Sequence, residues 1–195
     1  MSSSTHSAMI MAGGTGGHVY PGLAVASALR DAGWRVSWIG TARGLEARVV
    51  PVSGMTLHTL TTLGLRGKGI LSRLKGVFSL LFACLQALGL LLRHRPTLVI
   101  GFGGYAAGPA GAVATILRIP VLIHEQNAVA GTTNRLLARG ACRVMAGFEG
   151  AFALPAQSLV TGNPLRAELC QQPQKTYQQS MFTPERPLRI AILGG

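Results

Sequence analysis

Two short apolar runs in this chain end directly in clusters of glycine, and no other feature constrains the fold as strongly. Residues 8–12 are followed by GGTGGH at 13–18, and residues 97–100 are followed by GFGGY at 101–105. A pattern typical of a helix comes after each cluster. A buried strand, a glycine turn and a helix in this order begin a βαβ unit, so the sequence predicts a parallel sheet.

Further strands and helices continue the alternation along the chain. Short apolar runs predict the strands, and apolar residues spaced three and four apart predict the helices. The additional expected strands are 35–39, 57–60, 121–123, 143–146 and 158–160, and the expected helices are 20–32 and 106–117. The predicted fold class is therefore α/β, with a Rossmann-like parallel sheet whose ligand lies beyond the carboxyl ends of the strands.

The charge balance limits the choice of partners. The chain has 18 Lys+Arg and 6 Asp+Glu, a formal net charge of +12. Such a field attracts phosphate groups on nucleotides, nucleic acids or an anionic membrane. Nucleic acid is not expected, because the arginines are dispersed and no aromatic run offers a stacking surface. The cysteines show no metal-ligand spacing, which predicts a reduced, cytosolic chain with neither a metal site nor a cofactor.

One long apolar segment has two interpretations. Residues 76–92 are uncharged and follow a basic lead-in. Phe78, Leu81, Leu85 and Leu92 recur at helical spacing, which favours the core face of a crossover helix buried on both sides. Apolar residues also extend around the later turns, which suits the surface of an anionic membrane. A spanning helix would separate strands of one sheet and is not expected. The residues expected to face the membrane, within 65–85, are Arg66, Lys68, Arg73, Leu74, Lys75, Phe78 and Leu81.

The glycine clusters are suited to holding phosphate. Glycines let backbone N–H groups approach an anion, and a helix N-terminus adds a favourable dipole. The alternative is that they only permit tight turns. GFGGYA at 101–106 also matches the loose dinucleotide pattern G-x-G-x-x-A, although the acid expected near position 121 is missing. A nucleotide-dependent oxidoreductase is therefore the alternative enzyme class.

Polar residues at the same edge of the sheet are candidates for chemistry. His18 follows the first glycine cluster, where an imidazole could act as general base on a hydroxyl or merely cap the loop. HEQN at 124–127 follows a predicted strand. Arg166 follows the Asn163-Pro164 turn and could contact a phosphate.

Five segments together resemble one family. They are GGTGGHVYPGLAVA at 13–26, GLRGKG at 64–69, GFGGYAAGP at 101–109, HEQNAVAGTTN at 124–134 and TGNPLR at 161–166. They are similar to the signatures of the MurG family of bacterial glycosyltransferases. This resemblance implies the N-terminal domain of a GT-B fold. It also implies inverting transfer of N-acetylglucosamine from UDP-GlcNAc to the muramoyl C4 hydroxyl of lipid I, which forms lipid II for peptidoglycan synthesis and so serves cell shape and division.

The resemblance also implies roles for individual residues. His18 corresponds to the base that activates the acceptor hydroxyl, with Glu125 as the second candidate. The implied donor-binding residues are Thr15, Gly16, Gly17, Asn127 and Arg166. The implied acceptor and diphosphate residues are Gly13, Gly14, Gly103, Gly104, Tyr105, His124 and Gln126. The implied location is peripheral, on the cytoplasmic face of the inner membrane.

The end of the sequence predicts a second domain. Residues 1–170 are expected to form the acceptor-side domain, and the polar, proline-punctuated stretch 171–187 to be a linker. Residues 188–195 are expected to be the first strand of a donor-binding domain. On this interpretation the chain alone transfers no sugar. The remaining alternative is a non-catalytic, membrane-docking subunit of a split glycosyltransferase.

Overall fold

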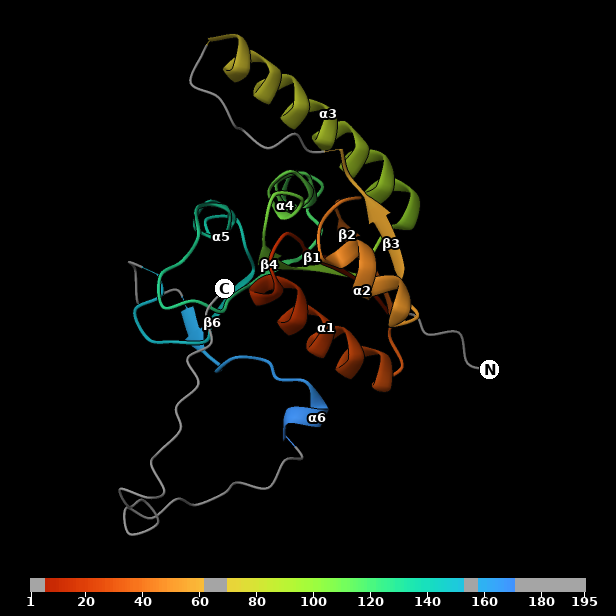
Figure 1. Ribbon diagram of the computed structural model, residues 1–195, viewed down its shortest axis with the longest axis vertical. Helices are drawn as coiled ribbons and strands as arrows, with labels where there is room; N and C mark the ends of the chain where they lie inside the picture. Colours follow the sequence, from red (N-terminus) through yellow and green to blue (C-terminus); the bar gives the residue numbers. More distant parts are fainter. Residues whose placement is uncertain (1–5, 62–69, 153–157, 171–195) are drawn as a thin grey trace, which may run out of the picture.

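A parallel sheet forms the centre of the protein (Figure 1). The computed structural model describes residues 6–61, 70–152 and 158–170. Within them the strands are β1 (Ser7–Ala12), β2 (Arg35–Gly40), β3 (Thr56–Thr59), β4 (Leu98–Gly103), β5 (Val121–Glu125), β6 (Arg143–Ala146) and β7 (Ser158–Val160). Their order is β3-β2-β1-β4-β5-β6-β7, and every neighbouring pair is parallel. The predicted α/β class and parallel sheet are confirmed.

Helices cover both faces of this sheet. They are α1 (Gly16–Asp31), α2 (Glu46–Val52), α3 (Ile70–His94), α4 (Ala107–Ile116), α5 (Thr132–Leu137) and α6 (Ala167–Cys170). Figure 1 shows α1 on one face and α4 on the other, with α3 lying beyond α4. The predicted linker at 171–187 and strand at 188–195 lie outside the described residues.

Successive side chains of β1 point to opposite faces of the sheet, so they belong to two core clusters, one on each face. Met9 and Met11 pack into a cluster with α4 and the buried residues of α3. Ile10 and Ala12 pack on the other side with residues of α1 and α2, around the fully buried Trp38. The indole N–H of Trp38 donates to the carbonyl of Ala12 at 2.8 Å, which holds the end of β1 where the first glycine cluster begins.

Helix α1 begins four residues before the predicted start at residue 20. The N–H groups of His18 and Val19 both donate to the carbonyl of Thr15 at 3.2 Å, so the glycines are drawn into the first turn. Thr15 itself is extended, with φ −100° and ψ 161°, and occupies the N-cap position. As a result, Gly16 and Gly17 belong to the first turn of the helix, and Gly13 and Gly14 precede it.

Helix α3 exposes most of its apolar surface, so the predicted core face is wrong. Phe78 is 70% exposed and Leu85 is 65% exposed. The fully buried residues are instead Ala83, Ala87 and Leu91, which form one narrow stripe. Helix α4 consists largely of Ala and Gly, and small residues on both helices let the two backbones approach closely. The alternative of burial on both sides is therefore also wrong.

By length and composition, Lys75–His94 of α3 could cross a membrane, and only 17% of its most apolar window is buried. The strand before α3 and the strand after it belong to the same parallel sheet. A helix that crossed a bilayer would place these two strands on opposite sides of it. The fold therefore favours an apolar helix lying along the outside of the domain.

Candidate functional site

The two glycine clusters meet at the carboxyl edge of the sheet. β1 and β4 are neighbours at the point where the strand order reverses, which is where open α/β sheets bind ligands. Gly104 has φ +92°, and a Cβ atom there would overlap the carbonyl oxygen of Gly13. The first loop (residues 13–18) and the second loop (residues 101–105) therefore pack backbone against backbone, and only glycine fits at position 104.

The first loop presents backbone N–H groups at the start of α1. Thr15 and Gly17 are exposed and Gly16 is half-buried. The N–H groups of the first helical turn have no acceptor within the helix, and the helix dipole adds a partial positive charge there. This geometry suits a phosphate group.

His18 lies between the two loops. Its Nδ1 is 3.3 Å from Oγ1 of Thr15. Its opposite edge faces the second loop, because a Cβ atom at Gly103 would lie 3.0 Å from Nε2. The ring is therefore held at the junction of the loops, within reach of any ligand that occupies both.

Glu125 is buried and holds the segment that follows β5. Only 1% of the residue is exposed. Oε1 accepts from the backbone N–H and the side-chain amide of Asn127, at 3.0 and 2.8 Å. Oε2 accepts from the N–H of Gly131 and the amide of Asn134, at 3.0 and 2.9 Å. With four donors on its carboxylate, Glu125 is placed to fix the exposed Asn127 rather than to exchange a proton with a ligand.

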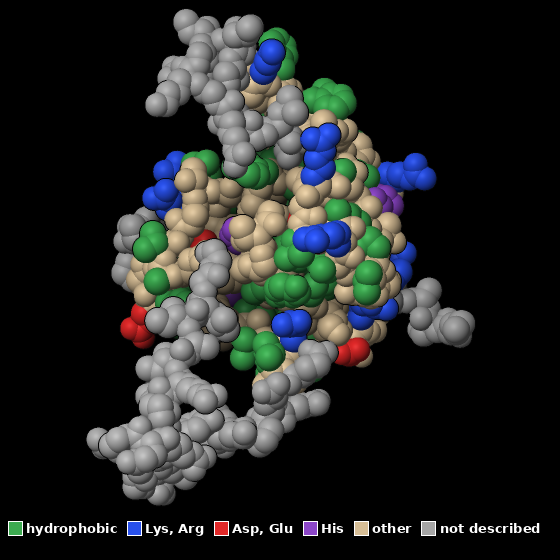
Figure 2. Space-filling model, in the orientation of Figure 1, with side chains coloured by type: hydrophobic (Ala, Val, Ile, Leu, Met, Phe, Trp, Pro, Cys, Tyr) green, Lys and Arg blue, Asp and Glu red, His purple; other side chains and the backbone are tan. Residues whose placement is uncertain are grey.

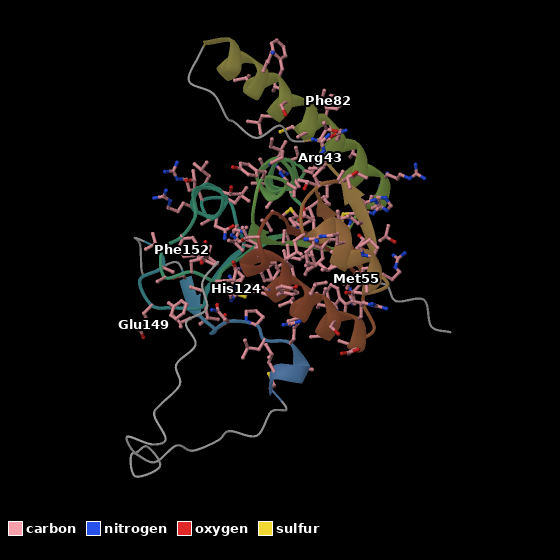
Figure 3. The ribbon with its side chains drawn as sticks, viewed as in Figure 1. Arg43, Met55, Phe82, His124, Glu149 and Phe152 are labelled. Atoms are coloured by element: carbon pink, nitrogen blue, oxygen red, sulfur yellow. The ribbon has the colours of Figure 1, made fainter. Side chains whose placement is uncertain are left out.

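His124 and Gln126 are also buried, and they connect β5 to the 162–163 turn. Nε2 of His124 lies 3.0 Å from the carbonyl oxygen of Gly162, so Nε2 carries the proton. Nδ1 then accepts from the amide of Gln126 at 3.3 Å, and Asn163 donates to the carbonyl of Gln126 at 3.1 Å. Burial lowers the pKa of His124, and its hydrogen bond to Gly162 and the charge of Glu125 oppose this shift only in part. Figure 3 shows where His124 lies relative to the sheet.

The lowered pKa of His124 predicts weaker folding in mild acid. The unfolded chain takes up a proton near the ordinary value of 6.5, before the folded chain does, so the free energy of unfolding falls as the pH drops below that value. His124→Gln keeps a donor for Gly162 but does not titrate. Its melting temperature should therefore fall less than that of the original chain between about pH 7.5 and 5.5. Equal slopes for the two proteins would contradict this assignment.

Arg166 lies near the first loop through an aromatic contact. Its guanidinium carbon is 4.6 Å from the centroid of the Tyr20 ring, a cation–π geometry. The same ring lies against Gly16, where a Cβ atom would be 3.2 Å from it. Arg166 is exposed, so the group remains available to an anion at this edge.

The other predicted site residues differ in how exposed they are. Tyr105 is 67% exposed directly after Gly104, whereas Gly13 and Gly103 are buried. On α3, the described membrane-facing residues Lys75, Phe78 and Leu81 are all exposed. Arg66 and Lys68 lie outside the described residues, and so do the side chains of Arg73 and Leu74. In Figure 2, Lys and Arg side chains are spread over the visible face rather than gathered in one patch. Among the described residues, no group of three or more His, Cys, Asp or Glu could hold a metal ion.

Glu46 belongs to the site and was missed by sequence reasoning. It is fully buried beneath the first loop, and its carboxylate accepts the N–H of Gly14 at 3.0 Å. The available signal was a lone acid in an acid-poor chain, two residues after Gly44. No motif marks it, because its hydrogen-bond partners, Gly14 and Thr41, come from two separate segments.

Known proteins are similar to this chain in sequence. The glycosyltransferase family 28 N-terminal domain matches residues 8–146. Two curated relatives, from Tolumonas auensis and Methylococcus capsulatus, are each 50% identical over 96% of this chain. Both are named UDP-N-acetylglucosamine--N-acetylmuramyl-(pentapeptide) pyrophosphoryl-undecaprenol N-acetylglucosamine transferase. The match covers 52% and 51% of these relatives, so the chain spans about half of their length.

Solved structures agree on the fold. The crystal structure of Acinetobacter baumannii MurG has a TM-score of 0.73 and 39% identity, over 87% of this chain and 50% of that one. The UDP-GlcNAc 2-epimerase of Methanocaldococcus jannaschii has a TM-score of 0.58 and 14% identity, over 82% of this chain and 46% of that one. At that identity the epimerase supports the fold alone.

Proposed function

Because the chain belongs to glycosyltransferase family 28, matching its N-terminal domain, we propose that it is the acceptor-side half of an enzyme that makes lipid II. The enzyme transfers N-acetylglucosamine from UDP-GlcNAc to the muramoyl C4 hydroxyl of lipid I. In this proposal the residues that the structure describes belong to the acceptor-side domain. The names of the curated relatives, which state this donor sugar and this type of acceptor, support the assignment.

The junction of the two glycine loops carries the proposal. The backbone of Gly104 packs on that of Gly13, and the His18 ring lies between the first and second loops. A general base therefore stands beside the exposed N–H groups at the start of α1. This combination suits a reaction that removes a proton from a hydroxyl close to a diphosphate.

The reaction is an inverting displacement at the anomeric carbon. The muramoyl C4 oxygen forms a bond to that carbon, the bond from the carbon to the UDP oxygen breaks, and UDP leaves with the bonding electron pair. The proton of the hydroxyl passes to the base. No covalent sugar–enzyme intermediate and no cofactor are required, so the protein must supply one base and stabilisation for the leaving diphosphate.

His18 can act as this base in one of its two tautomers. If the proton resides on Nδ1, it is donated to Oγ1 of Thr15, and Nε2 is left with a free lone pair. The Thr15 hydroxyl can accept from Nδ1, so this tautomer keeps its hydrogen bond while Nε2 accepts the hydroxyl proton.

The remaining site residues divide into contact and positioning roles. Thr15, Gly16, Gly17, Asn127 and Arg166 contact the donor across the cleft between the domains. On the acceptor side, Gly104 and the exposed Tyr105 contact the diphosphate of lipid I. The buried His124, Glu125 and Gln126 shape the β5 edge, and Gly13, Gly14 and Gly103 set the paths of the loops.

A nucleotide-dependent oxidoreductase gains no support from this geometry. The two glycines of the G-x-G-x-x-A match have other reasons to be there: a Cβ atom at Gly101 would collide with Ile123, and one at Gly103 would crowd the His18 ring. Glu125, the nearest acid to the position expected to bind a ribose, has both oxygens occupied within its own segment.

The exposed apolar side of α3 supports peripheral attachment to the cytoplasmic face of an anionic membrane. Phe78, Leu81 and Leu85 are all more than half exposed, next to the basic Lys75. An interfacial helix of this kind places the domain where a lipid-linked diphosphate lies at the level of the headgroups. The proposed membrane-facing segment is 65–85, whose side chains the structure describes from Lys75 onward.

Binding to vesicles tests this attachment. Neutralising Arg66, Lys68, Arg73 and Lys75 should remove about 1 kcal/mol each near an anionic surface, an effect that added salt screens. Phe78→Ser should reduce the part of the binding that persists at high salt, whereas Val52→Ser, which alters an exposed apolar residue on α2, should leave binding unchanged. The measurement is cosedimentation with vesicles of varied anionic content. Equal binding to neutral vesicles, or retention through an alkaline carbonate wash, would count against peripheral attachment.

The proposed activity is tested in a two-domain enzyme, meaning residues 1–195 continued by a donor-binding half, either their own or that of the Tolumonas auensis relative. Incubation with UDP-GlcNAc and lipid I should release UDP and form lipid II in equal amounts. Release of UDP without lipid II, or equal release when lipid I is omitted, would contradict the function.

A further inference from the structure

Glu46 is a buried acid outside the β5 segment, and the reaction does not use it. Within the described ranges, the buried polar or charged side chains are Glu46, His124, Glu125, Gln126 and Asn134. All except Glu46 lie between the end of β5 and α5. Burying a carboxylate is costly unless it is hydrogen-bonded, so its position requires an explanation.

Three glycines form the cavity that this carboxylate fills. They are Gly13 at the end of β1, Gly40 at the end of β2 and Gly44 ahead of α2. A Cβ atom at any of the three would collide with the Glu46 side chain. The backbone of three segments is thus shaped around one acid.

Hydrogen bonds to Glu46 come from two of these segments. Oε1 accepts the backbone N–H of Thr41 at 2.8 Å and its hydroxyl at 2.7 Å. The same hydroxyl accepts the N–H of Gly44 at 3.2 Å, so its own proton points to Glu46. Oε2 accepts the N–H of Gly14 at 3.0 Å. All three partners donate, so the site requires an acceptor at both oxygens.

The bond to Gly14 acts directly on the first loop. It fixes the peptide group between Gly13 and Gly14. The carbonyl oxygen of this peptide group, which belongs to Gly13, packs against Gly104 of the second loop. It also occupies the N–H of Gly14, so the N–H groups left for an anion are those of Thr15, Gly16 and Gly17. Thr15 in turn contacts His18.

We propose that Glu46 is a positioning residue, whose carboxylate holds the Gly13–Gly14 peptide so that the start of α1 and His18 face the reacting groups. This inference rests on the proposed glycosyl transfer for its effect on rate. The tether itself, from Glu46 to Gly14, does not depend on which reaction the enzyme performs.

Glu46→Gln tests the tether with little change in volume. The Gln oxygen can face the two donors of Thr41, but its NH₂ group then faces the N–H of Gly14, where two donors repel. Thr41→Val is the matched control, because it removes the hydroxyl from the same cluster and leaves the bond to Gly14. In the two-domain enzyme, Glu46→Gln should lower kcat/KM at least about tenfold, mostly through kcat, because a small misplacement of reacting groups is costly. Thr41→Val should stay within about twofold.

Two results would overturn the proposal: activity of Glu46→Gln within twofold of the original enzyme, or equal losses in both variants at matched melting temperatures. Amide hydrogen exchange gives a second readout, which does not require activity or a folded variant. In the original chain, the Gly14 N–H should exchange at least about tenfold more slowly than those of Gly16 and Gly17. Similar rates at the three glycines would refute the tether. An original enzyme that makes no lipid II but protects Gly14 would refute the function and leave the tether standing.

Discussion

In the two-domain enzyme, His18→Ala is expected to lower kcat by about 10²- to 10⁴-fold, the usual contribution of a general base. The KM for lipid I should change far less, because a base acts mainly in the transition state. The His18 ring is held between Thr15 and the second loop, and its Nε2 faces the second loop at the carboxyl edge of the sheet. The measurement is steady-state UDP release at varied lipid I.

A matched variant separates the hydrogen bond of His18 from the ring itself. Thr15→Val keeps the imidazole but removes its hydrogen-bond partner at Nδ1, so kcat should fall by less than in His18→Ala. If His18→Ala raises KM at unchanged kcat, then His18 binds substrate and is not the base.

Residues 1–195 alone are expected to transfer no sugar. The chain spans about half of its curated relatives, and the proposed donor-binding domain would lie in the half that it does not cover. Without them the donor is not held next to the acceptor hydroxyl, and the rate advantage of proximity is lost. The measurement is UDP release that depends on lipid I, using purified chain at concentrations where the two-domain enzyme gives a clear signal.

Adding a separately produced donor-binding half gives this experiment a positive control. Recovery of activity in the mixture would favour the split-enzyme alternative, in which the two halves meet as subunits. Lipid I-dependent UDP release from residues 1–195 without any addition would contradict the assignment of the donor site.

The sequence predicts the centre of the fold because its signals there are local. β1, β4 and α4 each follow from a short apolar run or a helical period next to glycine, and the structure places them within a few residues of the predicted bounds. Helices α2 and α5 are seven and six residues long, too short to show a period. They depend on tertiary contacts such as the buried Glu46 and Asn134.

The errors on α3 and in the site have related physical causes. When a helix is apolar on most of its circumference, periodicity cannot identify the packed face, and close approach to α4 selected Ala83 and Ala87 instead of the larger residues. The sequence likewise shows that residue 125 carries a carboxylate, but it does not show that four hydrogen-bond donors surround this carboxylate. Such surroundings come from residues distant in sequence and become visible only when the chain is folded.

The contact between Gly13 and Gly104 makes the two ligand loops mechanically dependent on each other. At this contact the two backbones meet directly, so a ligand that displaces one of them must also displace the other. If occupation of the first loop favours one arrangement of the second, thermodynamic linkage requires the converse by the same factor. Donor and acceptor affinities measured one at a time would then differ from those measured together, and the ratio of these affinities is the cooperativity of the enzyme.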